Sequence, residues 1–362
     1  MTERYIKGDT PPVERFQEGG LEVVNLSGFQ WWDVKKHYPD ELLETAERLI
    51  VMPDFNPGRS LLPTGSIVRM NTERIPGWRR YATGDIGCGM SWLKTELPYN
   101  AFVGHLGVWD EIAETIRGNH GKPGDLGSGN HFLDAVTSGE NGFMQFVVHT
   151  GSRDESTAVD SLINDPEEFD EAYAHAMAWA TINREAVMGI VRRAYKKLGV
   201  QMTTLFDNPH NLYVREDTDV VIYKGANRLK PGQLSVIPSH MAGPMALVRG
   251  SDALQDVEYG LLHGTGRATS RKDAKAVLHA AATPEGEYDF SSFRLDDRPT
   301  NLDEARQAFR DRRIYVPPVI PNRSIGTESP DSYRPLGPAL SRVRPLISML
   351  NMYRPVAYIG QL

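Results

Sequence analysis

The sequence has almost no cysteine. Cys88 is the only one among 362 residues, which excludes an internal disulfide. No apolar run approaches the roughly 20 residues that a membrane-spanning helix needs. The charged N-terminal stretch MTERYIKGDTPPVERF also lacks the apolar core of a signal peptide. We therefore expect a soluble, cytoplasmic protein without a membrane segment.

Positive charge is also in short supply. The formal net charge of −7 argues against broad, nonspecific coating of nucleic acid, which generally needs a basic surface. A local basic groove stays compatible with this balance. Arginines cluster at 69–81, 267–275 and 309–315, and for each cluster alone a solvated surface is the simpler interpretation.

The sequence contains no repeat, heptad run, low-complexity segment or Gly/Ser linker that would divide the chain. Its length permits one large domain or two. We expect a single catalytic domain over residues 1–362, with residues 1–20 forming a flexible N-terminal segment.

Periodicity predicts helices and strands together, and hence a mixed α/β (α+β) fold. Helical spacing appears at 39–52 and from Pro166 to Leu198, where Gly199 ends the pattern. Asn183 lies on the apolar stripe of the second helix, so its amide needs an internal partner. The segments 21–26, 143–149 and 219–225 have strand composition. Residues 291–345 are predicted to form a long irregular surface segment.

Four histidines, three of them close to glycine, stand out as candidate site residues: His131, His149, His210 and His263. Glycine allows close backbone approach and positive φ, so such positions favour a binding site. Each histidine alone is more simply a hydrogen-bonded core residue.

The segment DIGC changes this balance, because Asp85 and Cys88 add an oxygen and a sulfur ligand from one glycine-rich loop. Together with imidazoles they form a set typical of transition-metal sites. A thiolate can also bridge two ions. The alternative is a buried structural cysteine.

These segments resemble the RtcB family of RNA ligases. The matching motifs are MPD (52–54), DIGCGM (85–90), LGSGNHFLD (126–134), HTGSR (149–153), WATINRE (179–185), HN (210–211), YKGAN (223–227) and HGTGRATSR (263–271). They occur in the family's order from about residue 50 to residue 275. The resemblance implies a single-domain fold with mixed sheets around a central dinuclear metal cleft.

The resemblance also implies a function. The protein is expected to be a GTP-dependent RNA ligase with two Mn²⁺ ions, joining 3′-phosphate or 2′,3′-cyclic phosphate ends to 5′-hydroxyl ends, with RNA repair as its task. Cys88 would bridge the ions, with His149 and His210 completing one site and Asp85 and His131 the other. His263 would be the nucleophile that receives GMP.

Further residues match positions at the nucleotide and the RNA. Arg153, Arg267 and Arg271 match residues near the phosphates, where a guanidinium can bind oxygen pairs. The other expected nucleotide contacts are Asn130, Asp134, Thr265 and the stacking Tyr333. Asp54 matches an acidic residue near the incoming 5′-hydroxyl; its structural alternative is an N-cap or turn aspartate.

The sequence departs from the family pattern in the base pocket. His240 and Met245 stand where the family has serines, Asp134 replaces a glutamate, and Ile359 aligns with a lysine. Asn56 stands in place of a histidine. We therefore expect a looser preference for GTP over ATP than in typical members.

Two other functions stay open at this stage. A dinuclear phosphodiesterase could open cyclic ends without sealing them, and a noncatalytic protein could simply bind RNA ends. Thiolate and imidazole ligands would also suit zinc. The natural RNA, the oligomeric state and any accessory protein do not follow from the sequence.

Overall fold

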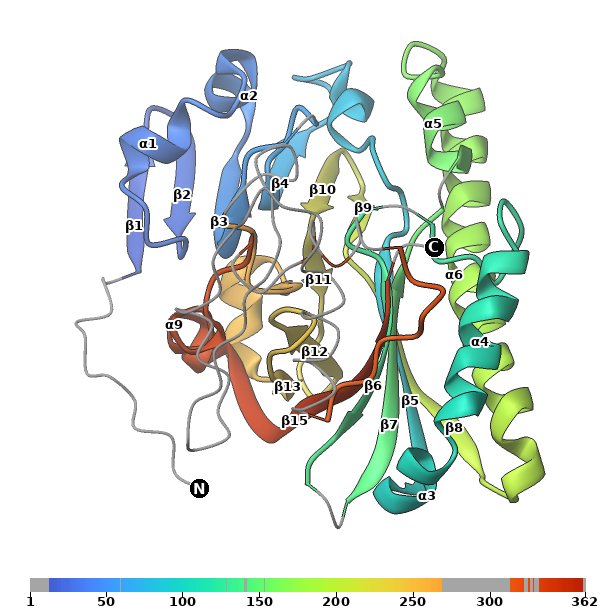
Figure 1. The fold of residues 1–362 in the computed structure, drawn as a ribbon. Helices are drawn as coiled ribbons and strands as arrows, with labels where there is room; N and C mark the ends of the chain where they lie inside the picture. The colour runs from blue at the N-terminus through green and yellow to red at the C-terminus, as the bar shows by residue number, and fades with distance from the viewer. Residues whose placement is uncertain are drawn as a thin grey trace, which may run out of the picture.

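The computed structural model describes residues 13–58, 60–127, 129–139, 142–152, 154–268, 313–321, 325, 328 and 332–360. Its described part contains two large β-sheets and a two-stranded ladder, with helices packed around them (Figure 1). The predicted mixed α/β class is confirmed.

The first sheet has six strands in the order β1 (Glu14–Glu18), β2 (Leu21–Asn25), β3 (Arg48–Asn56), β4 (Thr64–Asn71), β10 (Asp219–Lys224) and β9 (Asn211–Glu216). Only β2 and β3 pair in parallel. Their crossover contains the short helices α1 (Trp31–Lys35) and α2 (Asp40–Thr45). The strands predicted at 21–26 and 219–225 are confirmed.

Two N-terminal predictions need correction. The helix predicted at 39–52 ends at Thr45, and the apolar run from Leu49 to Met52 is a fully buried strand instead. A short run that is apolar on every side suits a strand covered on both faces better than an amphipathic helix. The expected flexible segment 1–20 overlaps β1, whose residues pair with β2.

The second sheet has seven antiparallel strands in the order β12 (Leu234–Pro238), β13 (Met245–Gly250), β15 (Ile347–Ile359), β6 (Phe132–Thr137), β7 (Phe143–Thr150), β5 (Gly89–Pro98) and β8 (Met202–Pro209). The small ladder pairs β11 (Ala226–Arg228) with β14 (Gly260–Leu262). The strand predicted at 143–149 is therefore confirmed.

The helices beside the second sheet are α3 (Tyr99–Gly104), α4 (Leu106–Gly118) and α6 (Pro166–Tyr195), and α5 (Asp154–Asp160) packs on α6. Short 3₁₀ turns are η1 (Trp78–Tyr81), η2 (Lys196–Leu198), η3 (Asp252–Val257) and η7 (Arg344–Leu346). In Figure 1, α4 and α6 cover the outer face of this sheet, and their apolar sides share one core with β5, β6 and β7.

Helix α6 confirms the longest helix prediction. Asp165 caps it by accepting a hydrogen bond from the backbone N–H of Glu168, and η2 continues it to Leu198 before Gly199 turns with φ 70°. Asn183 has the internal partners that its position requires: its Oδ1 accepts from Gly124 N at 2.8 Å, and its Nδ2 donates to Asp125 O at 2.9 Å.

The prediction for residues 291–345 is wrong in its described part. Helix α9 (Leu336–Val343) lies within it, and Ile314, Val316 and Ile320 are each 1% exposed in the main core. Apolar side chains spaced among prolines bury themselves without a regular period. Residues 291–312 of this segment lie outside the described residues.

Candidate metal centre and nucleotide cavity

Five candidate metal ligands converge because their strands are neighbours. Asp85 and Cys88 precede β5, His131 precedes β6, His149 lies near the end of β7, and His210 separates β8 from β9. The sheet order β6–β7–β5–β8 places these ends side by side. In register, Met90 pairs with His149, which also pairs with Phe132.

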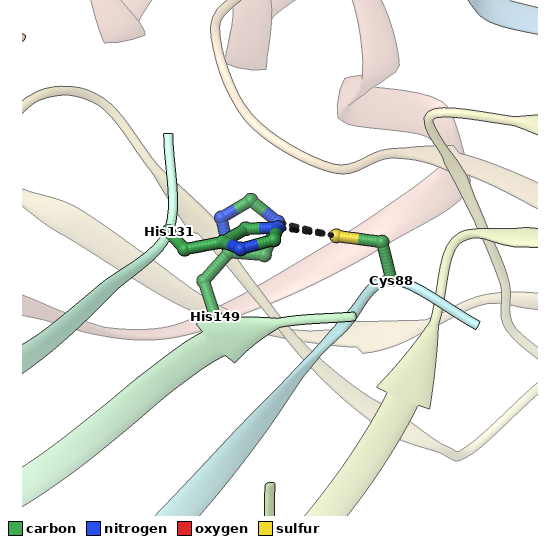
Figure 2. A group of neighbouring side chains, drawn as sticks. All are labelled: Cys88, His131 and His149. Carbon is green, nitrogen blue, oxygen red and sulfur yellow. Dashed lines mark hydrogen bonds between the residues drawn. The ribbon is translucent and has the colours of Figure 1, made fainter. Parts of the chain in front are cut away.

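Cys88 lies at the centre of the group. Its Sγ is 3.1 Å from His149 Nε2 and 3.4 Å from His131 Nε2, and Figure 2 shows both rings meeting at the thiol. Beyond His131, Asp85 Oδ2 lies 3.3 Å from its Nε2. Beyond His149, His210 Nε2 lies 3.2 Å from its Nε2. The thiol thus joins two sets of donors, Asp85 with His131 and His149 with His210.

Backbone carbonyls fix two of the three imidazole tautomers. His131 Nδ1 donates to Leu126 O at 2.8 Å, and His149 Nδ1 donates to Asn130 O at 3.0 Å. A carbonyl can only accept, so each ring presents the lone pair of Nε2 to the cluster. Among the described residues, His210 Nδ1 has no partner. The donor set fits a transition-metal ion.

Burial and neighbouring charge shift the pKa values of the cluster. Burial, together with the Asp85 carboxylate, raises the pKa of the Cys88 thiol well above its usual value. Burial and the surrounding imidazoles lower the pKa of His149. Burial also lowers the pKa of His210, with His263 and His149 adding to the effect. A bound cation would stabilise the thiolate and the neutral rings, which are the forms that bind metal.

The loop that carries Asp85 and Cys88 needs unusual backbone angles. Gly84 has φ 82° and Asp85 itself has φ 51°, a region that glycine and aspartate tolerate best. Gly151 packs against this loop, and a Cβ there would lie 2.4 Å from Asp85 Oδ1. The glycine-rich character of both motifs therefore reflects close approach of the two loops.

Lys224, at the end of β10, supports the same loop. Its Nζ donates to the carbonyls of Thr83 and Gly84, at 2.9 Å for Thr83, and it lines the adjoining cavity. Burial lowers the pKa of Lys224, and the charge of Asp85 opposes that shift. Lys224 therefore links the loop that carries Asp85 to the wall of the cavity.

His263 follows β14 and lies beside the metal cluster, with its ring centroid 4.5 Å from that of His210. Its Nδ1 is 2.7 Å from both Asp54 Oδ2 and Gly225 O. Because both partners accept, Nδ1 carries the proton, and in the neutral ring Nε2 has the free lone pair. Asp54 is fully buried in β3 and also accepts from the backbone N–H of His263. The N-cap and turn alternative for Asp54 is wrong.

A cavity of about 390 Å³ opens beside the cluster and His263, within the range of small-molecule sites. Asn56, Asn130, Asp134, Thr265, Arg267 and Tyr333 are among its lining residues. Asp134 Oδ1 and Thr265 Oγ1 are buried without a hydrogen-bond partner among the described residues. Burial raises the pKa of Asp134 well above its usual value. The cavity thus holds polar groups that a ligand could satisfy.

The structure corrects one residue expected in the base pocket. Ile359 is fully buried in the main core, and Tyr358 of the same strand lines the cavity. Tyr358 belongs to the same core, but only Tyr358, and not Ile359, lies at the cavity wall, as the alternation of side chains along a strand allows. His240 and Met245 do line the cavity, and burial lowers the pKa of His240 to about 3.

Arg267 lies in the cavity wall with Tyr333 and Glu328. Its Nη1 donates to Glu328 Oε2 at 3.1 Å, and its guanidinium lies 4.9 Å from the Tyr333 ring centroid. Glu328 is 3% exposed, and sequence inspection missed it because nothing marks a glutamate inside an irregular segment. Arg153 and Arg271 lie outside the described residues.

Comparisons with known proteins indicate what kind of protein has this arrangement. The sequence model of one family, described as tRNA-splicing ligase RtcB, matches residues 158–317. RNA-splicing ligase RtcB1 and RNA-splicing ligase RtcB, from Escherichia coli strains ATCC 25922 and K12, are each 26% identical to the chain over 332 residues. These alignments cover 66% of this chain and 79% of each relative. These similarities support placing the chain in the RtcB family.

The comparisons agree with the resemblance drawn from the motifs. The span matched by the family model includes His210 and His263, whereas Asp85, Cys88, His131 and His149 precede it. The geometry connects the two parts, because His149 and His210 lie in contact. No helix among the described residues is long and apolar enough to cross a membrane.

Proposed function

We propose that the protein is a GTP- and Mn²⁺-dependent RNA ligase that joins 3′-phosphate or 2′,3′-cyclic phosphate ends to 5′-hydroxyl ends. The observation that supports this most is the state of His263. Its Nδ1 proton is held by Asp54 and Gly225 O, so Nε2 is available as a nucleophile beside the metal cluster and at the cavity wall. A protein that only hydrolysed or bound RNA ends would not need this arrangement.

The first step would transfer GMP to His263. The lone pair of Nε2 attacks the α-phosphorus of GTP, a P–N bond forms, and the bond to the β-phosphate oxygen breaks to release pyrophosphate. The ring becomes cationic, and the Asp54 carboxylate stabilises it through Nδ1–H. Two divalent ions held by Cys88, Asp85 and the three histidines would neutralise phosphate charge.

The later steps would use the same centre. A 3′-phosphate oxygen of RNA attacks the GMP phosphorus, and the P–N bond breaks to restore His263. The 5′-hydroxyl of the second strand then attacks the activated 3′-phosphate, and GMP leaves. A 2′,3′-cyclic phosphate first takes up water to give the 3′-phosphate.

The cavity supports a purine nucleotide as the other ligand. The carboxyl of Asp134, whose Oδ1 has no partner among the described residues, could accept from the N1–H and the amino group of guanine once it ionises. His240 and Met245 replace hydroxyl groups expected from the family pattern, so fewer polar atoms are available to reject adenine. We expect ATP to compete with GTP more effectively than in typical members.

A two-part RNA assay tests the proposal. Wild-type protein with GTP and Mn²⁺ should join a 3′-phosphate RNA to a 5′-hydroxyl RNA, and His263→Ala should not. Given RNA already capped with GMP on its 3′-phosphate, His263→Ala should seal it, because only the first step requires Nε2. His149→Ala, which removes a metal ligand, should fail in both assays. Opening of cyclic ends without joining would instead support the phosphodiesterase.

A further inference from the structure

A half-exposed aromatic ring lies next to the catalytic pair, outside the cavity already described. Phe29, in the loop between β2 and α1, is 41% exposed. Its ring centroid is 6.1 Å from that of Phe55, the residue after Asp54. The guanidinium of Arg334 lies 4.8 Å from the Phe29 ring centroid. An aromatic ring held in this way offers a surface on which a flat group could stack.

Buried polar groups hold this loop in place. Asn25 Nδ2 donates to Phe29 O at 2.8 Å, and Ser27 Oγ accepts from Phe29 N at 3.1 Å. Ser27 in turn donates from its backbone N–H and its hydroxyl to Asn25 Oδ1. Both Asn25 and Ser27 are buried. The exposed ring therefore stands on a rigid support, which lowers the ordering cost of a ligand.

Two arginines flank the loop, and neither forms an ion pair among the described residues. Arg334 Nη1 donates to Pro53 O at 3.1 Å, and Arg342 Nη1 makes a longer contact of 3.4 Å to Leu26 O. Arg342 also lies against Gly28, where an added Cβ would meet its Nη2 at 2.1 Å. Both guanidinium groups keep donors for an anion.

Nine other described arginines pair with carboxylates: Arg48, Arg69, Arg79, Arg80, Arg117, Arg184, Arg192, Arg215 and Arg267. Arg334 and Arg342 are not among them, and what distinguishes these two is their position beside the Phe29 ring. An aromatic surface combined with phosphate-binding arginines is the usual means of binding single-stranded nucleic acid.

This surface continues the wall of the reaction site. Arg334 N donates to Gly266 O at 3.0 Å, and Gly266 lines the cavity and packs on the backbone of Asp54. The metal cluster contacts His263 through His210, whose ring centroid lies 4.5 Å from that of His263. A phosphate end would lie at the metals, so a strand entering past Phe29 would be the one that brings the hydroxyl.

We propose that Phe29, Arg334 and Arg342, here called the Phe29 subsite, bind the first nucleotides of the 5′-hydroxyl RNA strand. A base near the 5′ end stacks on Phe29, and the adjoining phosphates contact the two guanidinium groups. This inference rests on the proposed ligase function for the identity of the strand, and on the contacts above for the site itself.

Binding of a single-stranded RNA with a 5′-hydroxyl and a fluorescein on its 3′ end tests the subsite without any reaction. Phe29→Ala and Arg334→Gln should each raise Kd roughly tenfold or more. Arg334→Gln should also reduce the slope of log K against log salt by about 0.7. Phe29→Trp should retain binding, which separates stacking from loop collapse.

Matched controls are Phe143→Ala and Arg249→Gln, and both should bind like wild type. Phe143 is 53% exposed at the end of β7 away from His149, and Arg249 lies on β13. Wild-type Kd values for Phe29→Ala and Arg334→Gln, or equal weakening in the controls, would refute the subsite. Covalent GMP labelling of the wild-type protein is measured in parallel. Absent labelling with Phe29-dependent binding would overturn the ligase proposal alone.

Discussion

Replacement of Arg184 should damage both the fold and the metal centre. The side chain is 1% exposed in α6, and its Nη1 donates to Gly87 O at 2.6 Å and Thr150 O at 3.1 Å. These carbonyls precede Cys88 and follow His149. Its Nη2 donates to Asp207 Oδ2 at 2.9 Å. One guanidinium therefore holds the segments that carry two candidate ligands.

The cost of Arg184→Met can be worked out from these contacts. Breaking a buried ion pair costs about 3–5 kcal/mol, and the lower end applies because Asp207 is 26% exposed. Each carbonyl left unpaired adds about 1–3 kcal/mol. We expect a loss of at least about 5 kcal/mol in the free energy of unfolding, and a Mn²⁺ affinity lower by roughly 10- to 100-fold.

Arg192→Met is the matched control. It lies on the same helix and pairs with Glu185, but both side chains are more exposed, at 28% and 58%, so its ion pair is worth about 0–1 kcal/mol. Urea unfolding measures both variants, and Mn²⁺ titration measures affinity. Arg184→Lys provides a folded protein if Arg184→Met does not fold. Equal unfolding midpoints for the Arg184 and Arg192 variants would refute this reasoning.

Three further predictions concern the site itself. Cys88→Ser should lose bound Mn²⁺ in elemental analysis while keeping its circular dichroism spectrum, and full occupancy would contradict a bridging thiolate. Asp54→Asn should slow GMP labelling by about a hundredfold or more, since an amide cannot stabilise the cationic ring; a wild-type rate would exclude that role. Asp134→Asn should raise thermal stability at neutral pH. Its benefit should vanish as pH falls to the usual pKa of 3.8, because burial makes the folded state hold a proton that the unfolded state releases; a pH-independent effect would count against it.

Local signals explain which parts of the fold the sequence predicts. Helix α6 has a three- and four-residue apolar spacing, the Asp165 cap and a terminal Gly199, and all three agree. In the segment 39–52, only Asp40–Thr45 is helical. The later residues form β3, which pairs in parallel with β2. Pairing of that kind is nonlocal and leaves no periodic trace.

The candidate site likewise combines residues that local motifs predict with contacts that only the fold determines. Motifs nominate Cys88 and the histidines, but their contacts depend on the order of four neighbouring strands. The hydrogen bond from His263 to Asp54 spans 209 residues, so no local pattern could predict it. Alignment near the C-terminus selects Ile359, whereas strand register turns Tyr358 toward the cavity. An error of one residue in a strand moves a side chain to the other face.

The most direct test of the central claim is the intact mass of the protein after incubation with GTP and Mn²⁺, followed by peptide mapping. The account predicts a mass increase of one GMP, carried by the peptide that contains His263 and absent from His263→Ala. Asp54→Asn should accumulate the same adduct slowly. A protein that stays unmodified with Mn²⁺ bound, or an adduct on another residue, would contradict it.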